Sequence, residues 1–115
     1  MKVNLAEKLA AIDDRWQPRI VASYNDNDVI LVKVEGEFVW HSHPDTDDLF
    51  LVLAGEVNIE LRDRTVTLHP GELFVVPKGV EHRPVARREA HLLLIEPKAT
   101  PNTGDPATAT EKRPL

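Results

Sequence analysis

Residues 36–55 read GEFVWHSHPDTDDLFLVLAG and residues 71–82 read GELFVVPKGVEH. In each stretch a short apolar run lies between glycines and prolines, residues that often form turns. The same pattern of short runs and turns extends in both directions along the chain. It predicts about nine strands, at residues 19–24, 29–34, 38–42, 48–53, 57–61, 65–68, 73–76, 82–86 and 90–96. Short strands at this spacing favour an all-β sandwich or barrel over units in which strands alternate with helices.

The segments on either side of these strands have a different character. A helix is expected over residues 4–15, because Asn4 can cap it and apolar residues recur at helical spacing. Those apolar residues are Leu5, Leu9, Ile12 and Trp16. The end of the chain holds four of the nine prolines and shows no period, which indicates an extended or disordered tail. We therefore expect a helical segment at 1–18, a barrel at 19–96 and a tail at 97–115.

The composition of the 115-residue chain argues against several classes of function. The net charge of −5 argues against binding to nucleic acid. No apolar run approaches the roughly 18 residues that cross a membrane, and the first residues lack the apolar core of a secretory signal. We therefore expect a cytoplasmic protein with neither nucleic acid nor membrane as its partner. The chain has no cysteine, so a chemical site must use other side chains, and the five histidines come first.

Three of the five histidines are placed where they can meet. His41 and His43 are one residue apart, so on a strand both side chains point to the same side. Asp48 follows a polar loop, and His82 follows a turn much further along the chain. Imidazole and carboxylate groups together bind transition metals. Each residue alone is weak support, because a His-x-His pair is often incidental and a lone aspartate often caps a turn. Their combination with the surrounding glycines and prolines favours a joint site.

The two stretches quoted above resemble the two sequence motifs of the cupin superfamily. Residues 36–55 match a pattern of glycine, His-x-His, an acidic residue, six residues and glycine. Residues 71–82 match glycine, five residues, proline, one residue, glycine, two residues and histidine. The resemblance covers about residues 20–96 and implies a double-stranded β-helix, the jelly-roll or cupin barrel, preceded here by a short N-terminal helix. It implies one divalent transition-metal ion per chain, Zn, Fe, Mn or Ni. The implied ligands are His41, His43, Asp48 and His82.

The chain departs from these motifs in three places. The usual fourth ligand of the family is glutamate, and Asp48 is one methylene shorter. The ion would then lie closer to that strand, be bridged by water, or not bind the carboxylate. Asp47 is a neighbouring candidate, but the spacing to Gly55 favours Asp48. The asparagine that closes the second motif is replaced by Ala86. Four residues lie between Gly36 and His41, where five are usual.

The other titratable residues near the motifs have simpler interpretations. His69 lies in a turn and is expected to be exposed. His91 alternates with Leu93 and Ile95, so we expect it to face the barrel interior as a structural histidine. Exposed turn positions are expected for the two glutamates beside the motifs, which makes them poor proton carriers. These glutamates are Glu37 and Glu81.

The implied function is that of a metal-dependent enzyme acting on a small organic molecule inside the barrel. Four protein ligands leave two positions open on an octahedral ion, which suits oxygenase, isomerase or lyase chemistry. A non-catalytic binding or sensing module is the alternative, and a barrel merely stabilised by its ion is a third possibility. The residues expected to surround the ligand are Phe50, Val52, Val39 and Phe74.

The strand at 48–53 is apolar on both faces. Phe50 and Val52 alternate with leucines at 49, 51 and 53. One face fills the barrel, so the other must be covered by a second sheet, the N-terminal helix or another subunit. Small cupins are commonly dimers, and we therefore expect a homodimer.

Overall fold

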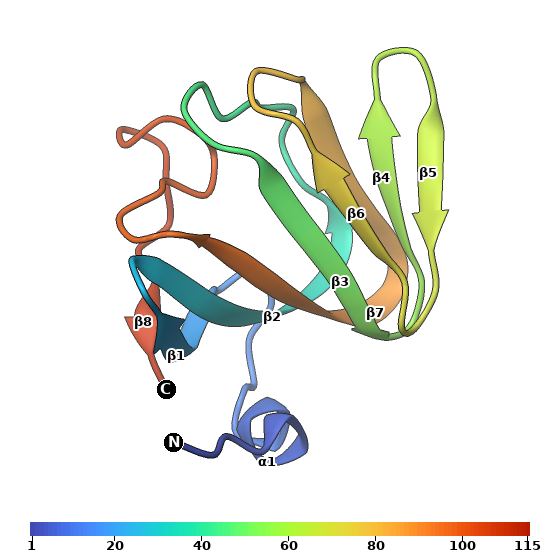
Figure 1. The fold of residues 1–115 in the computed structure, drawn as a ribbon. Helices are drawn as coiled ribbons and strands as arrows, with labels where there is room; N and C mark the ends of the chain where they lie inside the picture. Colours follow the sequence, from blue (N-terminus) through green and yellow to red (C-terminus); the bar gives the residue numbers. More distant parts are fainter.

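The computed structural model describes residues 1–115 and consists mainly of strands that form two packed layers (Figure 1). This confirms the all-β jelly-roll expected from the sequence, although the sheet is not closed into a complete ring. The elements are α1 (Leu5–Ala10), β1 (Arg19–Tyr24), β2 (Asn27–Glu37), β3 (Asp48–Ala54), β4 (Val57–Leu61), β5 (Thr65–Leu68), β6 (Leu73–Val76), β7 (His82–Pro97) and β8 (Arg113–Pro114).

The long strand β7 joins the two layers. Its first half pairs with β4, and its second half pairs with β3, while β2 runs antiparallel to it along most of its length. One layer is therefore the β4–β5 hairpin with the start of β7. The other continues through β6, β3, β7, β2 and β1. In Figure 1 the hairpin stands on one side of the molecule and β1 and β8 on the other. Two runs expected as separate strands, 82–86 and 90–96, are thus one strand with exposed residues between them.

The space between the layers is filled by the larger apolar cluster. Its buried members include Val34, Val52, Ile59 and Leu92, which come from four different strands. Gly55 lets the turn after β3 approach β7, because it has a positive φ of 80° and a Cβ there would lie 2.9 Å from Ala90 Cβ. Any larger residue would push the turn away from the strand that carries part of the site.

A smaller apolar cluster covers the outer face of the second layer. Its buried residues are Ile12, Val21, Leu31 and Leu93, and side chains of α1 pack against them. The leucines of β3 expected to need a cover, Leu51 and Leu53, belong to this cluster. The N-terminal helix therefore supplies at least part of that cover.

The helix is shorter than the expected residues 4–15. Asn4 caps it as expected, with its side chain accepting a hydrogen bond from Glu7 N at 3.1 Å, but the helix ends at Ala10. Trp16 has a positive φ of 59°, and its backbone N–H donates to Lys33 O at 2.8 Å. The turn sends Trp16 into the inner cluster while Ile12 stays in the outer one. One helical stripe could not serve both faces of the sheet.

The strand expected at 38–42 does not form. Only His41 pairs there, in an isolated bridge with His82. The two residues exchange backbone hydrogen bonds of 3.0 and 2.9 Å. The preceding strand β2 is longer than expected and continues to Glu37. Residues 38–47 are therefore a connecting loop held to the start of β7 by this bridge and by a hydrogen bond of 3.0 Å from Phe38 N to Pro84 O.

The segment after β7 runs back across the molecule. Its last strand, β8, pairs in parallel with β1 at Arg19 and Ile20. Gly104 packs so closely on the loop before β3 that a side chain at this position would collide with the carbonyl of Ser42. The division of the chain at residues 18 and 96 stays a prediction.

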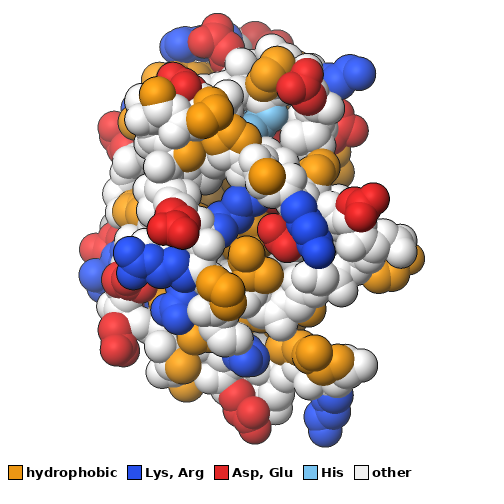
Figure 2. Space-filling model, turned by 90° about the vertical axis from the view of Figure 1, so that its left-hand side faces the viewer, with side chains coloured by type: hydrophobic (Ala, Val, Ile, Leu, Met, Phe, Trp, Pro, Cys, Tyr) orange, Lys and Arg blue, Asp and Glu red, His pale blue; other side chains and the backbone are white.

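The helices and the surface charges add two further observations. No helix in the structure is both long and apolar enough to span a membrane. On the side drawn in Figure 2, lysine and arginine side chains lie among acidic and apolar ones and do not form one continuous basic surface.

Candidate metal centre

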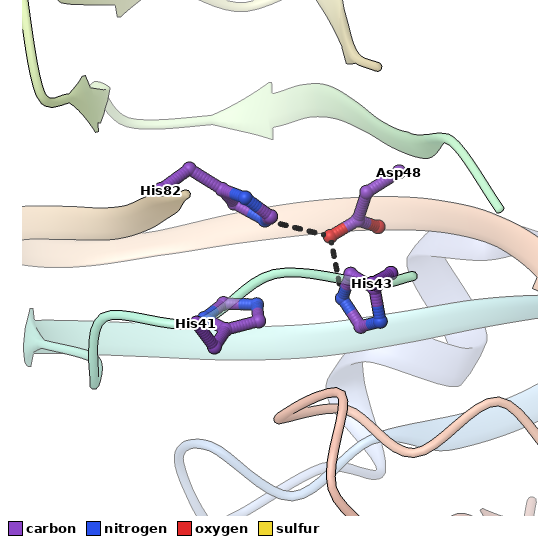
Figure 3. A group of neighbouring side chains, drawn as sticks. All are labelled: His41, His43, Asp48 and His82. Atoms are coloured by element: carbon purple, nitrogen blue, oxygen red, sulfur yellow. Dashed lines mark hydrogen bonds and ion pairs between the residues drawn. The ribbon is translucent and has the colours of Figure 1, made fainter. Parts of the chain in front are cut away.

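Four polar side chains meet in the interior between the two layers. His41 and His43 come from the loop between β2 and β3, Asp48 begins β3, and His82 begins β7. Each offers one potential ligand atom, and these atoms all lie within 4.8 Å of one another. All four residues are buried, with exposed fractions between 1% and 8%. Figure 3 shows the side chains pointing toward one shared space. We call these four residues the His/Asp cluster.

Backbone carbonyls orient two of the three imidazoles. His41 Nδ1 donates to Val39 O at 2.9 Å, and His82 Nδ1 donates to Val80 O at 2.9 Å. Because a carbonyl oxygen can only accept, the ring proton of each neutral imidazole lies on Nδ1. Nε2 of each ring is then unprotonated and carries a free lone pair. This is the form of histidine that binds a metal ion, and such orienting hydrogen bonds are typical of metal-binding histidines.

One carboxylate oxygen of Asp48 lies between the rings of His43 and His82. Asp48 Oδ2 lies 3.0 Å from His82 Nε2 and 3.2 Å from His43 Nε2 (Figure 3). His82 already donates through Nδ1, so it could donate to Asp48 as well only as a charged imidazolium. His43 Nδ1 is buried and has no hydrogen-bond partner. The cluster thus has more buried acceptors than protons, and a bound cation would satisfy its lone pairs together. On this observation the residues fit a transition-metal ion.

Together, burial and mutual contacts lower the pKa of two members of the cluster, His41 and Asp48. Burial lowers the pKa of His41 to about 4, partly opposed by the hydrogen bond to Val39 and reinforced by the neighbouring His82 and His43. Burial alone would raise the pKa of Asp48, but the neighbouring imidazoles of His43 and His82 outweigh it and bring the pKa to about 2. At neutral pH His41 is therefore neutral and Asp48 ionised, which are the states that bind a metal.

Three residues of the cluster, His41, His43 and Asp48, line a pocket that is mostly apolar. The space in it that the centre of a water-sized molecule can reach is about 50 Å³. Trp16 and Phe38 stack on one side with ring centroids 5.1 Å apart, and Phe38 meets His41 edge-on at 5.2 Å. The residues that line it are Trp16, Pro18, Val32, Val34, Phe38, His41, His43, Asp48, Phe50, Pro84, Leu92, Leu94, Glu96 and Asn102. Such a pocket suits a small, partly apolar molecule beside the cluster.

Comparison with known families identifies the fold family. Residues 28–96, more than half of the chain, match the family model described as the cupin domain. The chain belongs to the cupin family. The resemblance found in the two motifs is thereby confirmed, and the His/Asp cluster occupies the motif positions of this cupin.

Two solved structures align with most of this cupin. A cupin-2 domain protein from Shewanella frigidimarina NCIMB 400 is 48% identical with a TM-score of 0.83, over 84% of this chain and 94% of that one. NMB1881 from Neisseria meningitidis is 35% identical with a TM-score of 0.78, over 85% of this chain and 100% of that one. Among curated proteins, YdbB of Bacillus subtilis (strain 168) is 42% identical over 64 residues, covering 55% of this cupin and 57% of YdbB. The match therefore spans little more than half of that relative.

The structure brings together the four residues singled out from the sequence. The competing acid, Asp47, lies outside the cluster and accepts a hydrogen bond from Lys78 N at 2.9 Å. His69 is exposed as expected, with 59% of its side chain accessible. The interior position expected for His91 is wrong, because its neighbours Ala90 and Leu92 are the inward residues of β7. His91 lies on the opposite face of β7.

The expected pocket wall is confirmed only in part. Phe50 lines the pocket, whereas Val39 is 55% exposed and does not. Glu96 and Asn102 line the pocket and were missed. Glu96 could have been found, because it follows Leu92 and Leu94 at two-residue spacing on a strand. Asn102 lies in an irregular segment, and no periodic signal marks it.

Proposed function

We propose that this cupin is a metal-dependent enzyme that acts on a small organic molecule in the pocket. The proposed ligands of one divalent transition-metal ion are His41, His43, Asp48 and His82. The observation that carries this proposal is the buried His/Asp cluster, in which the unprotonated Nε2 atoms of His41 and His82 share one space with the Asp48 carboxylate.

The residues of the cluster would contribute to metal binding in different ways. His41 and His82 supply Nε2 lone pairs fixed in direction by the backbone, and Asp48 supplies negative charge. The stacked rings of Trp16 and Phe38 form part of the apolar wall of the pocket. A divalent ion held here would act as a Lewis acid on an oxygen atom of the ligand, with redox chemistry available in addition from a metal such as iron.

Elemental analysis of the purified, tag-free protein tests the proposal. We expect close to one transition-metal ion per chain. Iron, manganese or nickel would direct the next assay to oxygen uptake with small acids and diketones. Zinc would direct it to hydrolytic, isomerase or lyase reactions, because zinc has no redox role. A chain that holds no metal, even after incubation with each of these ions and desalting, would contradict the proposal.

A binding or sensing module is the competing function, and turnover distinguishes it from an enzyme. Such a module would take up the same metal and the same ligand and release the ligand unchanged. We expect a ligand that binds the metal-loaded protein to be converted, as followed by mass spectrometry of the small-molecule fraction. Recovery of every tight-binding ligand unchanged would favour the binding module.

We also propose that the protein is a homodimer. Leu73, Val75 and Ile95 are 56%, 41% and 38% exposed on the outer face of one layer. They are neighbours, because Leu49 of β3 pairs with Val75 on one side and Ile95 on the other. An exposed apolar surface of this kind is typical of a subunit interface. Light scattering at high micromolar concentration should give twice the monomer mass, and a clean monomer would contradict the proposal.

A further inference from the structure

A second carboxylate lies in the wall of the pocket. Glu96 is only 4% exposed, yet it lines the same pocket as the His/Asp cluster. It continues the row formed by Leu92 and Leu94 on the inner face of β7. Removing a carboxylate from water is unfavourable unless its charge is paired. The environment of Glu96 therefore needs an explanation.

The partner of Glu96 comes from the segment that follows the last long strand. Lys112 Nζ donates to Glu96 Oε1 at 2.7 Å, and both side chains are less than a tenth exposed. The neighbours of Lys112 are fixed as well, since Glu111 O accepts from Gln17 Nε2 at 2.7 Å and Arg113 lies in β8. A buried ion pair stabilises a fold little more than apolar residues of the same size would. Stability alone is thus a weak reason for this pair.

The pair leaves hydrogen-bonding capacity unused. A carboxylate accepts several hydrogen bonds. Within the protein, only Oε1 of Glu96 accepts one, while Oε2 accepts none and is not fully buried. Asn102 lines the pocket too. Its Oδ1 accepts from Thr110 N at 2.9 Å, which leaves its amide N–H groups without a protein partner. The polar part of the pocket wall thus offers an acceptor and a donor to a ligand.

Charge and size restrict the group that would bind there. The charges of Glu96 and Lys112 neutralise each other. A cationic group would therefore lose its hydration and gain little electrostatic attraction. A neutral hydroxyl can both donate to Glu96 and accept from Asn102. The reachable space of about 50 Å³ admits only a few water-sized groups, because one water needs about 10–15 Å³ on this measure.

We propose that Glu96, held in place by Lys112, binds the hydroxyl group of a small ligand whose other end offers oxygen atoms to the metal at the His/Asp cluster. The substrate class is therefore a short hydroxylated oxygen-donor molecule, such as a hydroxy acid. This inference rests on the proposed metal site. The match to the cupin domain ends at residue 96, so Asn102 and Lys112 lie outside the matched region.

Calorimetry with paired probes tests the inference on the full-length, zinc-loaded protein. The pairs are propionate with 3-hydroxypropionate and butyrate with 4-hydroxybutyrate, and the readout is the ratio of the two Kd values within each pair. A hydrogen bond to a charged acceptor predicts that one hydroxy acid binds about tenfold more tightly than its parent acid. The double variant Glu96→Met/Lys112→Met removes both charges at similar size, and its ratio should fall to about one.

Two further variants separate ligand binding from docking of the segment. Lys8→Met removes the hydrogen bond from Lys8 Nζ to Leu115 O at 2.9 Å, which anchors the same segment at its far end. Its ratio should equal that of the wild type. Glu96→Gln keeps the size of the side chain and removes the charge, so its ratio should fall below that of the wild type even if the double variant folds poorly.

The outcomes distinguish this inference from the proposed function. Zinc uptake with a ratio near one for both wild-type pairs, or a tenfold ratio kept in the variants of Glu96, would overturn the inference and leave the metal site standing. Failure of the wild type to take up zinc or any of the other ions named above would leave the ligand without a metal to bind and would overturn both.

Discussion

The protein places histidine beside carboxylate in two regions that differ in burial. In the His/Asp cluster, Asp48 stands between the rings of His43 and His82, each almost fully buried. At the surface, His69 stands between Glu56 and Glu72, at 2.9 and 3.2 Å, with more than half of each side chain exposed. Distances and residue types are nearly the same. What differs is access to water.

Water decides what each arrangement can do. At the surface, solvent screens the charges and satisfies any free lone pair, so ion pairs there contribute little. In the interior, His43 Nδ1 has no hydrogen-bond partner, and the Asp48 carboxylate accepts fewer hydrogen bonds than it could. Only a buried cluster of this kind gains much from a cation. The comparison therefore predicts that substitutions with the same chemistry will have unequal effects in the two regions.

Removing one ring from each region should give the largest contrast. We expect His82→Ala to reduce metal content from about one ion per chain to near zero, because it removes a fixed Nε2 from the cluster. His69→Ala is the matched control and should keep the wild-type content. Elemental analysis after desalting measures both, with circular dichroism to verify that the strands persist. Full metal content in His82→Ala would show that the ligand assignment is wrong.

Changing the central carboxylate should give the next largest effect. Asp48→Asn keeps the shape and removes the charge, so we expect metal affinity to fall at least tenfold, measured by competition with a chelator. Asp48→Glu should retain affinity better, since it restores the residue usual in the family. Equal affinity for wild type and Asp48→Asn would mean that the carboxylate does not bind the ion directly.

Acid should destabilise the metal-free protein through His41. Its pKa is about 4 in the fold and about 6.5 when unfolded, so the unfolded state binds more protons as pH falls from 6.5 toward 4. The contribution lost between pH 7.5 and pH 5 is about 2 kcal/mol. Urea denaturation of the chelator-treated protein at these two pH values measures it.

A variant isolates this effect from the rest of the cluster. The pKa of His43 is raised, by its hydrogen bond and charge interaction with Asp48 against the effect of burial, so protonation of His43 acts in the opposite direction. The comparison is therefore between wild type and His41→Gln, which should lose less stability on acidification. An identical pH dependence in the two proteins would count against a buried, neutral His41.

The surface histidine provides the smallest expected effect. His69→Gln should leave the melting temperature and its pH dependence unchanged within error, measured by calorimetry at pH 7.5 and pH 5. Its ion pairs with two glutamates are exposed to solvent, which screens them. A clear loss of stability would mean that distance, and not burial, governs these pairs.

Much of the site could be predicted from the sequence because turns and spacing determine it. The glycine and proline frame identified all four cluster residues and preferred Asp48 over Asp47. The local structure expected around two of these residues was wrong, however. His41 and His43 were expected on a strand that would align them, but they lie in a loop tied to β7 by one bridge.

The remaining errors concern tertiary contacts that no local pattern contains. The helix was expected to reach residue 15, but it stops so that Trp16 can enter the inner cluster. Glu96 was assigned to a strand without a role, since its partner Lys112 lies in a segment without periodicity. Contacts between distant segments set both outcomes, and composition and spacing within each segment do not record them.

The position of Lys112 has a consequence for the order of events during synthesis. All four cluster residues and Glu96 leave the ribosome before Lys112, and domains generally fold as units from the N-terminus while the chain is made. In any intermediate in which the strands have formed but residues 97–115 have not docked, Glu96 is therefore a carboxylate without its ion-pair partner in an incomplete pocket wall.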